Sequence, residues 1–314
     1  MRAQPGTEPR VAVIVPCYNE EVAIGKVVSD LRTAMPTADV YVYDNASTDN
    51  TAQVASAAGA IVRREDRRGK GNVVRRAFAD VDADIYAMID GDDTYDAGAL
   101  PQMVEVLRSK CLDHVLGVRT ASLGSSAYRP GHESGNRMFN RLVGGLFGEP
   151  VSDMLSGYRV MSRRFVKSFP ALSREFETET ELTVHCMSLR VPQAEVSVGF
   201  KDRPPGSESK LRTYHDGLRI LRLVVSLVQH ERPLQFYSLI AAFFALVGLG
   251  LAIPVFVGFA TTGLVRTPTA VLSSSLMIVA MLSLVVALVL NSVMRSRQEA
   301  ARLAYLQYPP PPPL

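Results

Sequence analysis

The sequence predicts an α/β domain with a mostly parallel, Rossmann-like sheet, followed by an amphipathic helix and two transmembrane helices. Three observations lead to this prediction. Short β-branched runs alternate with helical patterns in the first part of the 314-residue chain, as is typical of a parallel sheet covered by helices on both faces. Polar loops follow each of these runs. Two long apolar stretches lie near the C-terminus.

The strands and helices are expected at regular spacing. The predicted strands cover residues 10–15, 39–43, 60–64 and the apolar run that ends before Asp90. The helices that follow the first three strands are predicted to end near Ala34, at Ala58 and near Ala79. Ser47 or Thr48 is the expected N-cap of the second helix, because a hydroxyl oxygen there can accept a hydrogen bond from the helix's first turn.

The fourth strand ends in the acidic sequence DGDD at residues 90–93. Asp90 and Asp92 can present hard oxygen ligands to Mg²⁺ or Mn²⁺, which bind through one or two carboxylates together with the phosphates of a substrate. Gly91 between them allows the backbone to approach a ligand closely. The simpler alternative is an acidic turn that caps the next helix, since Asp and Gly are ordinary turn residues.

The polar loops are expected to converge on one cleft, because open parallel sheets bind ligands beyond the carboxyl ends of their strands. A nucleotide diphosphate would suit such a cleft. The expected contacts are Tyr18, Asn19, Asp44 and Asn45 for base and ribose, Lys70 with nearby amides for the pyrophosphate, and Asp90 with Asp92 for the metal. Structural alternatives are a packed Tyr18, an Asp44 that only orders its turn, and a solvated charge run at residues 67–70.

The C-terminal part is predicted to cross a membrane twice. Residues 233–265 and 267–294 contain no Asp, Glu, Lys or Arg, and each run exceeds the roughly 20 residues that span a bilayer. The alternative is a pair of buried core helices. Residues 213–232 have the pattern of a basic amphipathic helix, expected in the membrane interface or packed on the catalytic domain.

The positive charges around the two apolar runs predict their orientation. Arginines outside the runs are Arg219, Arg222, Arg232, Arg295, Arg297 and Arg302, against Arg266 alone between them. Both termini and the N-terminal domain are therefore expected in the cytoplasm, at the inner (plasma) membrane. Residues 1–9 are polar and lack the apolar core of a signal peptide.

Composition argues against several other classes of protein. The net charge of +3 is too small to suggest binding to nucleic acid. The three cysteines, Cys17, Cys111 and Cys186, are scattered and form neither a disulfide framework nor a zinc-binding pattern. A reducing compartment is the expected setting.

Several motifs occur in an order that resembles a known family. PCYNE at 16–20, DNASTD at 44–49 and DGD at 90–92 are similar to the signatures of family-two inverting glycosyltransferases with the GT-A nucleotide-sugar fold. GNR at 135–137, SDMLSGYR at 152–159, FETETEL at 176–182 and GSESKL at 206–211 resemble its polyprenyl-phosphate branch, which includes dolichyl-phosphate mannose synthase. The resemblance covers residues 11–234 and the two-span anchor.

The resemblance implies roles for individual residues. Those expected at the nucleotide sugar are Pro16, Tyr18, Asn19, Glu20, Asp44, Asn45, Ser47, Lys70, Gly71, Asp90 and Gly91. Those expected at the acceptor phosphate are Arg119, Arg137, Ser209 and Lys210, and the catalytic set is Asp92, Arg137 and Asp153, with a positioning role for Asp153. Two positions depart from the family pattern. Asn45 replaces a second Asp, and Thr94 replaces a Gln that can assist the metal, which leaves Asp93 as a substitute ligand.

The implied reaction is transfer of one sugar from a nucleotide sugar to a polyprenyl phosphate, with inversion and a divalent metal. A UDP-sugar is the expected donor by analogy with bacterial relatives, and GDP-mannose is the alternative. A second alternative is transfer to a sugar hydroxyl or glycolipid in cell-envelope polysaccharide synthesis; the absence of Trp argues against the processive synthases. A non-enzymatic membrane anchor is the third.

The sequence also predicts how the chain is divided. The expected segments are a flexible start at 1–9, a catalytic domain at 10–212, a juxtamembrane helix at 213–232, a transmembrane hairpin at 233–296 and a Pro-rich tail at 297–314. A homo-oligomer is left open.

Overall fold

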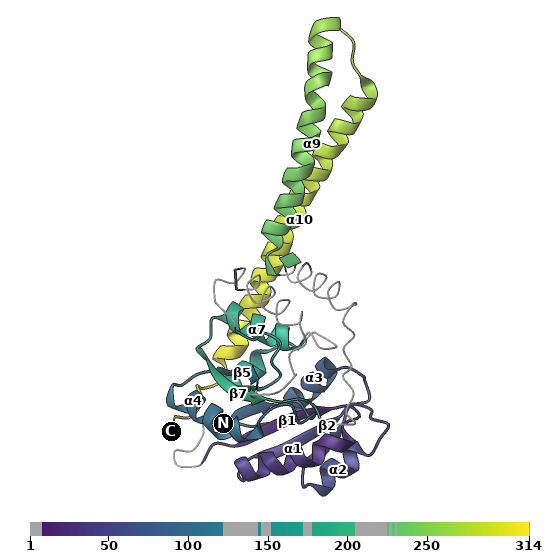
Figure 1. Cartoon of the computed structure of the whole chain (residues 1–314). Coiled ribbons are helices and arrows are strands. Elements are labelled where there is room, and N and C mark those ends of the chain that lie inside the picture. The colour runs from purple at the N-terminus through teal and green to yellow at the C-terminus, as the bar shows by residue number, and fades with distance from the viewer. Residues whose placement is uncertain are drawn as a thin grey trace. The chain divides into compact units, whose positions relative to one another are not determined.

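The computed structural model describes residues 8–121, 144–145, 152–171, 178–204, 225, 228–229 and 231–313. The expected site residues Arg137, Ser209 and Lys210, and most of the amphipathic segment 213–232, lie outside the described residues. The chain divides into two compact units, residues 1–211 with 300–314 and residues 212–299. The first unit carries the sheet (Figure 1).

A seven-stranded sheet has the order β3-β2-β1-β4-β6-β5-β7 (Figure 1). Its strands are β1 (Val11–Cys17), β2 (Asp39–Asp44), β3 (Ile61–Arg64), β4 (Ile85–Met88), β5 (His114–Ala121), β6 (Arg159–Ser162) and β7 (Gln193–Phe200). Strand β6 runs antiparallel to both of its neighbours, and the other described pairs are parallel. The predicted mostly parallel sheet is therefore confirmed.

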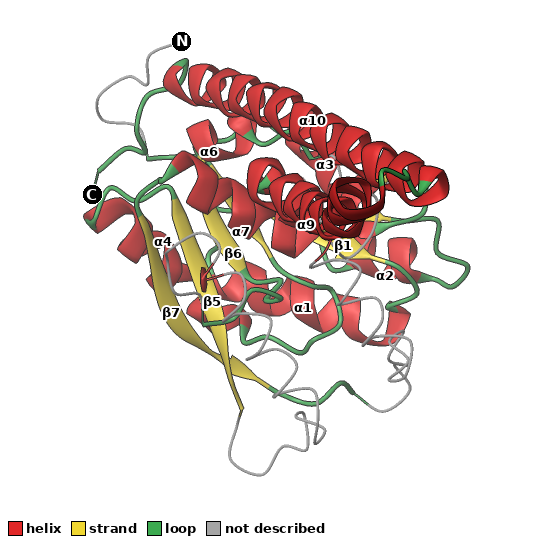
Figure 2. Ribbon diagram, turned by 90° about the horizontal axis from the view of Figure 1, so that it is seen from above, coloured by secondary structure: helices red, strands yellow, loops and turns green. Residues whose placement is uncertain are grey.

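Helices cover both faces of the sheet (Figure 2). One face packs on α1 (Glu21–Ala34), α2 (Thr51–Ala57) and α4 (Leu100–Ser109), and the short 3-10 helix η1 (Ala97–Ala99) precedes α4. The other face packs on α3 (Lys70–Asp80), α6 (Arg163–Ser168) and α7 (Thr178–Leu189). The buried side chains of β1 and β4 alternate between these two cores, since successive residues of a strand point to opposite faces.

Two predicted details of the elements are wrong. Neither Ser47 nor Thr48 caps α2, which begins at Thr51 after Asn50. The hydroxyl oxygen of Ser47 instead accepts a hydrogen bond from the N–H of Asn19, 2.9 Å away, so it joins two loops. The sequence also indicates a strand over residues 115–118 with Arg119 at its end, but Arg119 lies within β5, because β5 continues to pair with β7 as far as Ala121.

Two long apolar helices, α9 (Pro233–Thr262) and α10 (Thr267–Leu306), are long and apolar enough to cross a membrane. Only 11% of the most apolar window of each is buried, which argues against the alternative of two core helices. Small residues line their contact: the hydroxyl of Ser273 donates to the carbonyl of Gly248 at 2.8 Å, and Ala280 and Ala287 are buried. Small residues allow close approach of membrane helices.

The C-terminal residues from Ala300 onward belong to the first unit. Helix α10 extends to Leu306, so part of the segment predicted as a tail is helical. The side chain of Tyr305 is buried in the core on the α3 face of the sheet. Beyond the helix, the guanidinium of Arg108 donates to the carbonyl oxygens of Pro312 and Pro313, at 3.4 and 2.8 Å.

Candidate active site

The polar loops identified in the sequence lie at one edge of the sheet. Strands β1, β2, β4, β5 and β7 all end at this edge, and the antiparallel β6 begins there, as the pairing of Met88 with Arg159 and of Arg159 with Leu116 shows. The residues after β1, β2 and β4 therefore lie beside those that precede β6. The predicted convergence of polar loops is present in the described part of the chain.

The loops after β1 and β2 are joined by side-chain hydrogen bonds. The amide oxygen of Asn19 accepts from the N–H of Thr48 at 2.8 Å, and the N–H of Glu20 donates to the hydroxyl of Thr51 at 2.9 Å. Asn19 itself has a φ of +54°, a conformation that Asn tolerates better than most residues. The buried carboxylate of Asp44 accepts from the N–H of Ser47 at 3.2 Å. These residues thus shape the predicted nucleotide loops.

Asn45 fixes the next loop along the edge. Its amide nitrogen donates to the carbonyls of Glu65 and Arg67, at 3.0 and 2.7 Å, and its amide oxygen accepts from the N–H of Gly69 at 2.7 Å. All three contacts are to backbone groups, and a carboxylate at this position could accept but not donate. Asn45 therefore has a structural reason to differ from the family's Asp. Arg68 from the same loop lies over the ring of Tyr18, with 5.2 Å from Cζ to the ring centroid.

Two glycines near the end of β4, Gly91 and Gly157, lie so close to neighbouring side chains that a Cβ at either position would force those side chains to move. A Cβ on Gly91 would lie 2.4 Å from the sulfur of Cys17, and a Cβ on Gly157 would lie 2.4 Å from a carboxylate oxygen of Asp90. The N–H of Gly157 donates to the hydroxyl of Tyr95 at 2.8 Å. The SGYR motif at 156–159, which ends with the first residue of β6, thus lies directly beside the Asp90 carboxylate.

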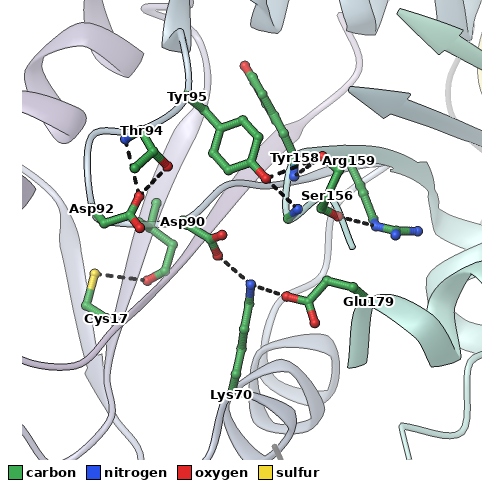
Figure 3. Close-up of polar contacts among 12 residues, drawn as sticks. Cys17, Lys70, Asp90, Asp92, Thr94, Tyr95, Ser156, Tyr158, Arg159 and Glu179 are labelled. Carbon is green, nitrogen blue, oxygen red and sulfur yellow. Dashed lines mark hydrogen bonds and ion pairs between the residues drawn. The ribbon is translucent and has the colours of Figure 1, made fainter. Parts of the chain in front are cut away.

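Asp90 forms an ion pair with Lys70, the first residue of α3 (Figure 3). The ammonium of Lys70 also pairs with the carboxylate of Glu179, at the start of α7. Burial alone would lower the pKa of Lys70, but the two carboxylates outweigh it and raise the pKa above its usual value. Glu179 was not among the predicted site residues; its only signal in the sequence is its place in the FETETEL motif.

Asp92 lies between a hydroxyl and a guanidinium. Its Oδ1 accepts from the hydroxyl of Thr94 at 2.6 Å (Figure 3), and its Oδ2 accepts from Nη2 of Arg203 at 2.6 Å. Burial raises the pKa of Asp92, the neighbouring Asp90 raises it further, and Arg203 opposes both. Nη1 of Arg203 also lies 3.9 Å from Glu20. Arg203 was missed by the sequence reasoning, although its place just after the last strand puts it on the same edge.

Asp93 has other partners. Its Oδ1 accepts from Lys201 at 2.8 Å and from Lys26 at 3.3 Å, and its backbone adopts a φ of +56°. Thr94, at the position of the family's Gln, orients Asp92. Among the described residues, Lys26 and Lys201 thus form ion pairs with the carboxylate of Asp93, which is the expected substitute metal ligand.

Arg119 and Asp153, predicted at the acceptor phosphate and among the catalytic residues, contact each other. Nε and Nη2 of Arg119 donate to the two carboxylate oxygens of Asp153, both at 2.7 Å. The guanidinium also lies over the ring of Phe200, with 5.3 Å from Cζ to the centroid. Such bidentate pairs are strong and geometrically specific, so Asp153 holds Arg119 at the edge of the sheet.

The side chains at the β4 tip fit a hard divalent cation. The carboxylates of Asp90 and Glu179 pair with Lys70, and those of Asp92 and Glu20 lie beside Arg203. Four negative and two positive charges leave a net charge of −2 when all are ionised. The described residues contain no group of three or more His, Cys, Asp or Glu side chains arranged for a metal. Mg²⁺ and Mn²⁺ need only one or two carboxylates when substrate phosphates complete the coordination.

The family of the chain follows from its sequence. Residues 12–169 match the family model described as Glycosyl transferase family 2. The chain belongs to this family. It is 34% identical over 248 residues to glycosyltransferase AglJ of Haloferax volcanii, a match that covers 79% of this chain and 81% of that protein. It is 29% identical over 223 residues to the dolichyl-phosphate hexose transferase of the same organism, which covers 71% of this chain and 95% of that protein.

A solved structure with the same fold is glucosyl-3-phosphoglycerate synthase from Mycobacterium tuberculosis, in complex with Mn²⁺, uridine diphosphate and phosphoglyceric acid. The TM-score is 0.57 at 22% identity, over 70% of this chain and 78% of that one. This family-two chain is therefore a glycosyltransferase with the GT-A fold, and the predicted family, fold and enzyme class are confirmed.

Proposed function

We propose that this glycosyltransferase moves one hexose from a UDP-sugar to the phosphate of a polyprenyl phosphate and inverts the anomeric centre. The observation that carries the proposal is the pairing at the sheet edge: the two carboxylates Asp90 and Asp92, which follow β4, form ion pairs with Lys70 of α3 and with Arg203 after β7. The similarity to a dolichyl-phosphate hexose transferase over 95% of its length supports the same acceptor class.

The proposed reaction depends on stabilisation of the negative charge on the leaving diphosphate more than on proton transfer. A phosphate monoester has a second pKa of about 6 and is largely dianionic at neutral pH, so its oxygen can attack the anomeric carbon without a general base. As that bond forms, the bond to the diphosphate oxygen breaks and the nucleotide leaves with the negative charge. A divalent cation held by Asp90 and Asp92 would supply electrostatic stabilisation of the departing diphosphate.

The cationic side chains have a second task, because two anions must approach each other in line. Arg203, beside Asp92, and Arg119, held by Asp153, are the described basic groups on the acceptor side. Fixed positive charges in a partly buried site stabilise developing negative charge without reorganisation. We assign Arg119 and Arg203 to the acceptor phosphate, and Arg137, Ser209 and Lys210 remain predicted contacts outside the described residues.

The ion pair of Asp153 also argues against transfer to a sugar hydroxyl. A hydroxyl acceptor needs a general base within hydrogen-bond reach. Both carboxylate oxygens of Asp153, the acid expected near that position, accept hydrogen bonds from Arg119. Asp153 is therefore a positioning residue, and a phosphate acceptor needs no other role from it.

The nucleotide site is proposed at the loops after β1 and β2. In the pairing of β1 with β2, Pro16 lies opposite Tyr43. Tyr18, Asp44 and Asn45 lie at or just after the ends of these two strands. Gly71 is a buried residue in the first turn of α3, directly after Lys70, which is the proposed pyrophosphate contact. The fold is shared with an enzyme crystallised with uridine diphosphate and Mn²⁺, which supports a UDP-sugar and either Mn²⁺ or Mg²⁺. GDP-mannose is the alternative donor.

The acceptor requires a membrane, and α9 with α10 supplies the proposed anchor. Side chains such as Leu239, Phe256 and Met281 expose more than 70% of their surface along these helices, which a bilayer would cover. The arginine distribution supports an inner-membrane location with the catalytic domain and both termini in the cytoplasm.

A transfer assay tests the proposed function. Full-length protein in detergent, supplied with labelled UDP-hexoses, Mn²⁺ and a polyprenyl phosphate, should produce a labelled sugar that extracts with the lipid. Omitting the polyprenyl phosphate should abolish the extractable label. Transfer only to water or to a free saccharide would overturn the lipid acceptor, and labelling from GDP-mannose alone would overturn the donor.

The orientation is tested with cysteine labelling. Val265 lies between α9 and α10 and is 52% exposed, whereas the native Cys111 is exposed on the catalytic unit. In intact cells, a membrane-impermeant maleimide should label the new thiol of the Val265→Cys variant and spare Cys111. In broken cells both should react. Labelling of Cys111 in intact cells would reverse the proposed topology.

A further inference from the structure

The ammonium group of Lys70 is a buried cation placed where the metal chemistry is expected. It donates to Oδ1 of Asp90 and to Oε1 of Glu179, and these three residues come from α3, the β4 tip and α7 (Figure 3). The side chains of Lys70 and Glu179 are only 10% and 7% exposed, against 28% for Asp90. The more open of the two carboxylates is therefore the one proposed to hold the metal.

Lys70 and a divalent cation would compete for the same carboxylate. An ammonium bound to Asp90 Oδ1 withdraws negative charge from that group and repels a second cation at close range. Leaving a buried lysine without an anionic partner is strongly unfavourable, so Lys70 can release Asp90 only if another acceptor takes its place.

Glu179 can be that acceptor. Its Oε1 already pairs with Lys70, and its Oε2 is buried and has no hydrogen-bond partner among the described residues. A buried carboxylate oxygen without a donor is costly, so a shift of the ammonium toward Glu179 would satisfy an atom that is now unsatisfied. The third N–H of Lys70 is then available to an incoming diphosphate.

We propose that Lys70 is the counter-ion of Asp90 as long as no metal is bound. When metal and nucleotide bind together, the ammonium of Lys70 moves away from Asp90, and Glu179 keeps it paired. This inference rests on the proposed metal site at Asp90 and Asp92. The consequence is that the binding of the metal and the binding of the nucleotide are coupled. The metal alone binds weakly because it must displace Lys70, and the nucleotide diphosphate strengthens metal binding because it supplies the displaced ammonium with a new anionic partner.

Direct binding of Mn²⁺ to the full-length protein in detergent tests the proposal, with free Mn²⁺ measured by electron paramagnetic resonance, with and without UDP. For the wild type we expect UDP to tighten Mn²⁺ binding at least about tenfold. Lys70→Met should bind Mn²⁺ alone about tenfold more tightly than the wild type. UDP should tighten its Mn²⁺ binding by a smaller factor than in the wild type, because only the contribution of the phosphates to the coordination remains. Glu179→Gln should bind Mn²⁺ more weakly, because Lys70 keeps Asp90 as its only charged partner.

Lys26→Met is the matched control. Lys26 pairs with Asp30 and Asp93 and has no ion pair with Asp90 in the structure, so its loss removes a nearby positive charge without freeing the metal-binding carboxylate. Its affinity for Mn²⁺ should change less than about twofold. Equal gains in Lys26→Met and Lys70→Met, or no gain in Lys70→Met, would overturn the proposal.

If Lys70→Met does not fold, Lys70→Gln can replace it. This variant keeps a hydrogen-bond donor for the two carboxylates but removes the positive charge, so the same gain in affinity for Mn²⁺ alone is expected. No lipid or sugar transfer enters the measurement, so a failure of the proposed acceptor leaves this result intact. A metal site elsewhere would show as Mn²⁺ binding that survives Asp90→Asn unchanged.

Discussion

Replacing Asp92 with asparagine is expected to lower kcat/KM about a thousandfold, which corresponds to roughly 4 kcal/mol of transition-state stabilisation. The substitution keeps the shape of the side chain and an oxygen that can accept from Thr94, 2.6 Å away in the structure. It removes one negative charge from the pair proposed to hold the metal. The measurement is the initial rate of sugar transfer to polyprenyl phosphate at saturating Mn²⁺.

The fold should tolerate this change. Burial and the neighbouring Asp90 raise the pKa of Asp92, so its ionised form costs the native state stability above its unfolded pKa, and a neutral amide removes that cost. The midpoint of thermal unfolding of Asp92→Asn should therefore stay within about 3 °C of that of the wild type.

Asp93→Asn is the matched control, because it removes the adjacent negative charge. Asp93 pairs with Lys26 and Lys201, and Asn suits its left-handed backbone. This variant should keep activity within about fivefold. If Asp93→Asn lost as much activity as Asp92→Asn, Asp93 would be a metal ligand after all. Full activity in Asp92→Asn would remove the metal role of Asp92.

Replacing Asp113 with alanine is expected to destabilise the catalytic unit by about 3–5 kcal/mol, because it leaves buried charge without a partner. Asp113 is fully buried, and its carboxylate accepts from Nε and Nη2 of Arg164 at 2.6 and 2.7 Å. It also accepts from the hydroxyls of Ser162 at 2.6 Å and Tyr305 at 2.9 Å. A drop of roughly 10 °C in the unfolding midpoint in detergent should follow.

Tyr305→Phe gives the comparison for this prediction. It deletes one hydrogen bond to the same carboxylate and keeps the ring that packs against Arg164, with 4.6 Å from Cζ to the centroid. The expected loss is about 1 kcal/mol. A loss in Asp113→Ala no larger than that in Tyr305→Phe would mean that the Arg164 ion pair does not stabilise the fold. Any loss in Tyr305→Phe also reports that the end of α10 is part of the catalytic unit.

Much of the fold and part of the site could be predicted from the sequence, because local patterns carry them. The β-branched runs before residues 16, 44 and 90 and the helical periodicity between them indicate a parallel sheet with its loops at one edge. The two apolar runs predict α9 and most of α10 by their length and their apolar composition. Asp44, Asn45, Asp90 and Asp92 were placed correctly at that edge, since the end of each parallel strand determines where the next residues lie.

Only the tertiary structure decided which charges meet. Glu179 is 109 residues from Lys70, Arg203 is 111 residues from Asp92, and Tyr305 is 192 residues from Asp113. Periodicity reports which face of an element a residue occupies, but not which distant element packs there. Ion-pair partners depend on that packing, and so the pairing of Arg119 with Asp153 and the position of Lys70 between two carboxylates emerge only when the strands are assembled.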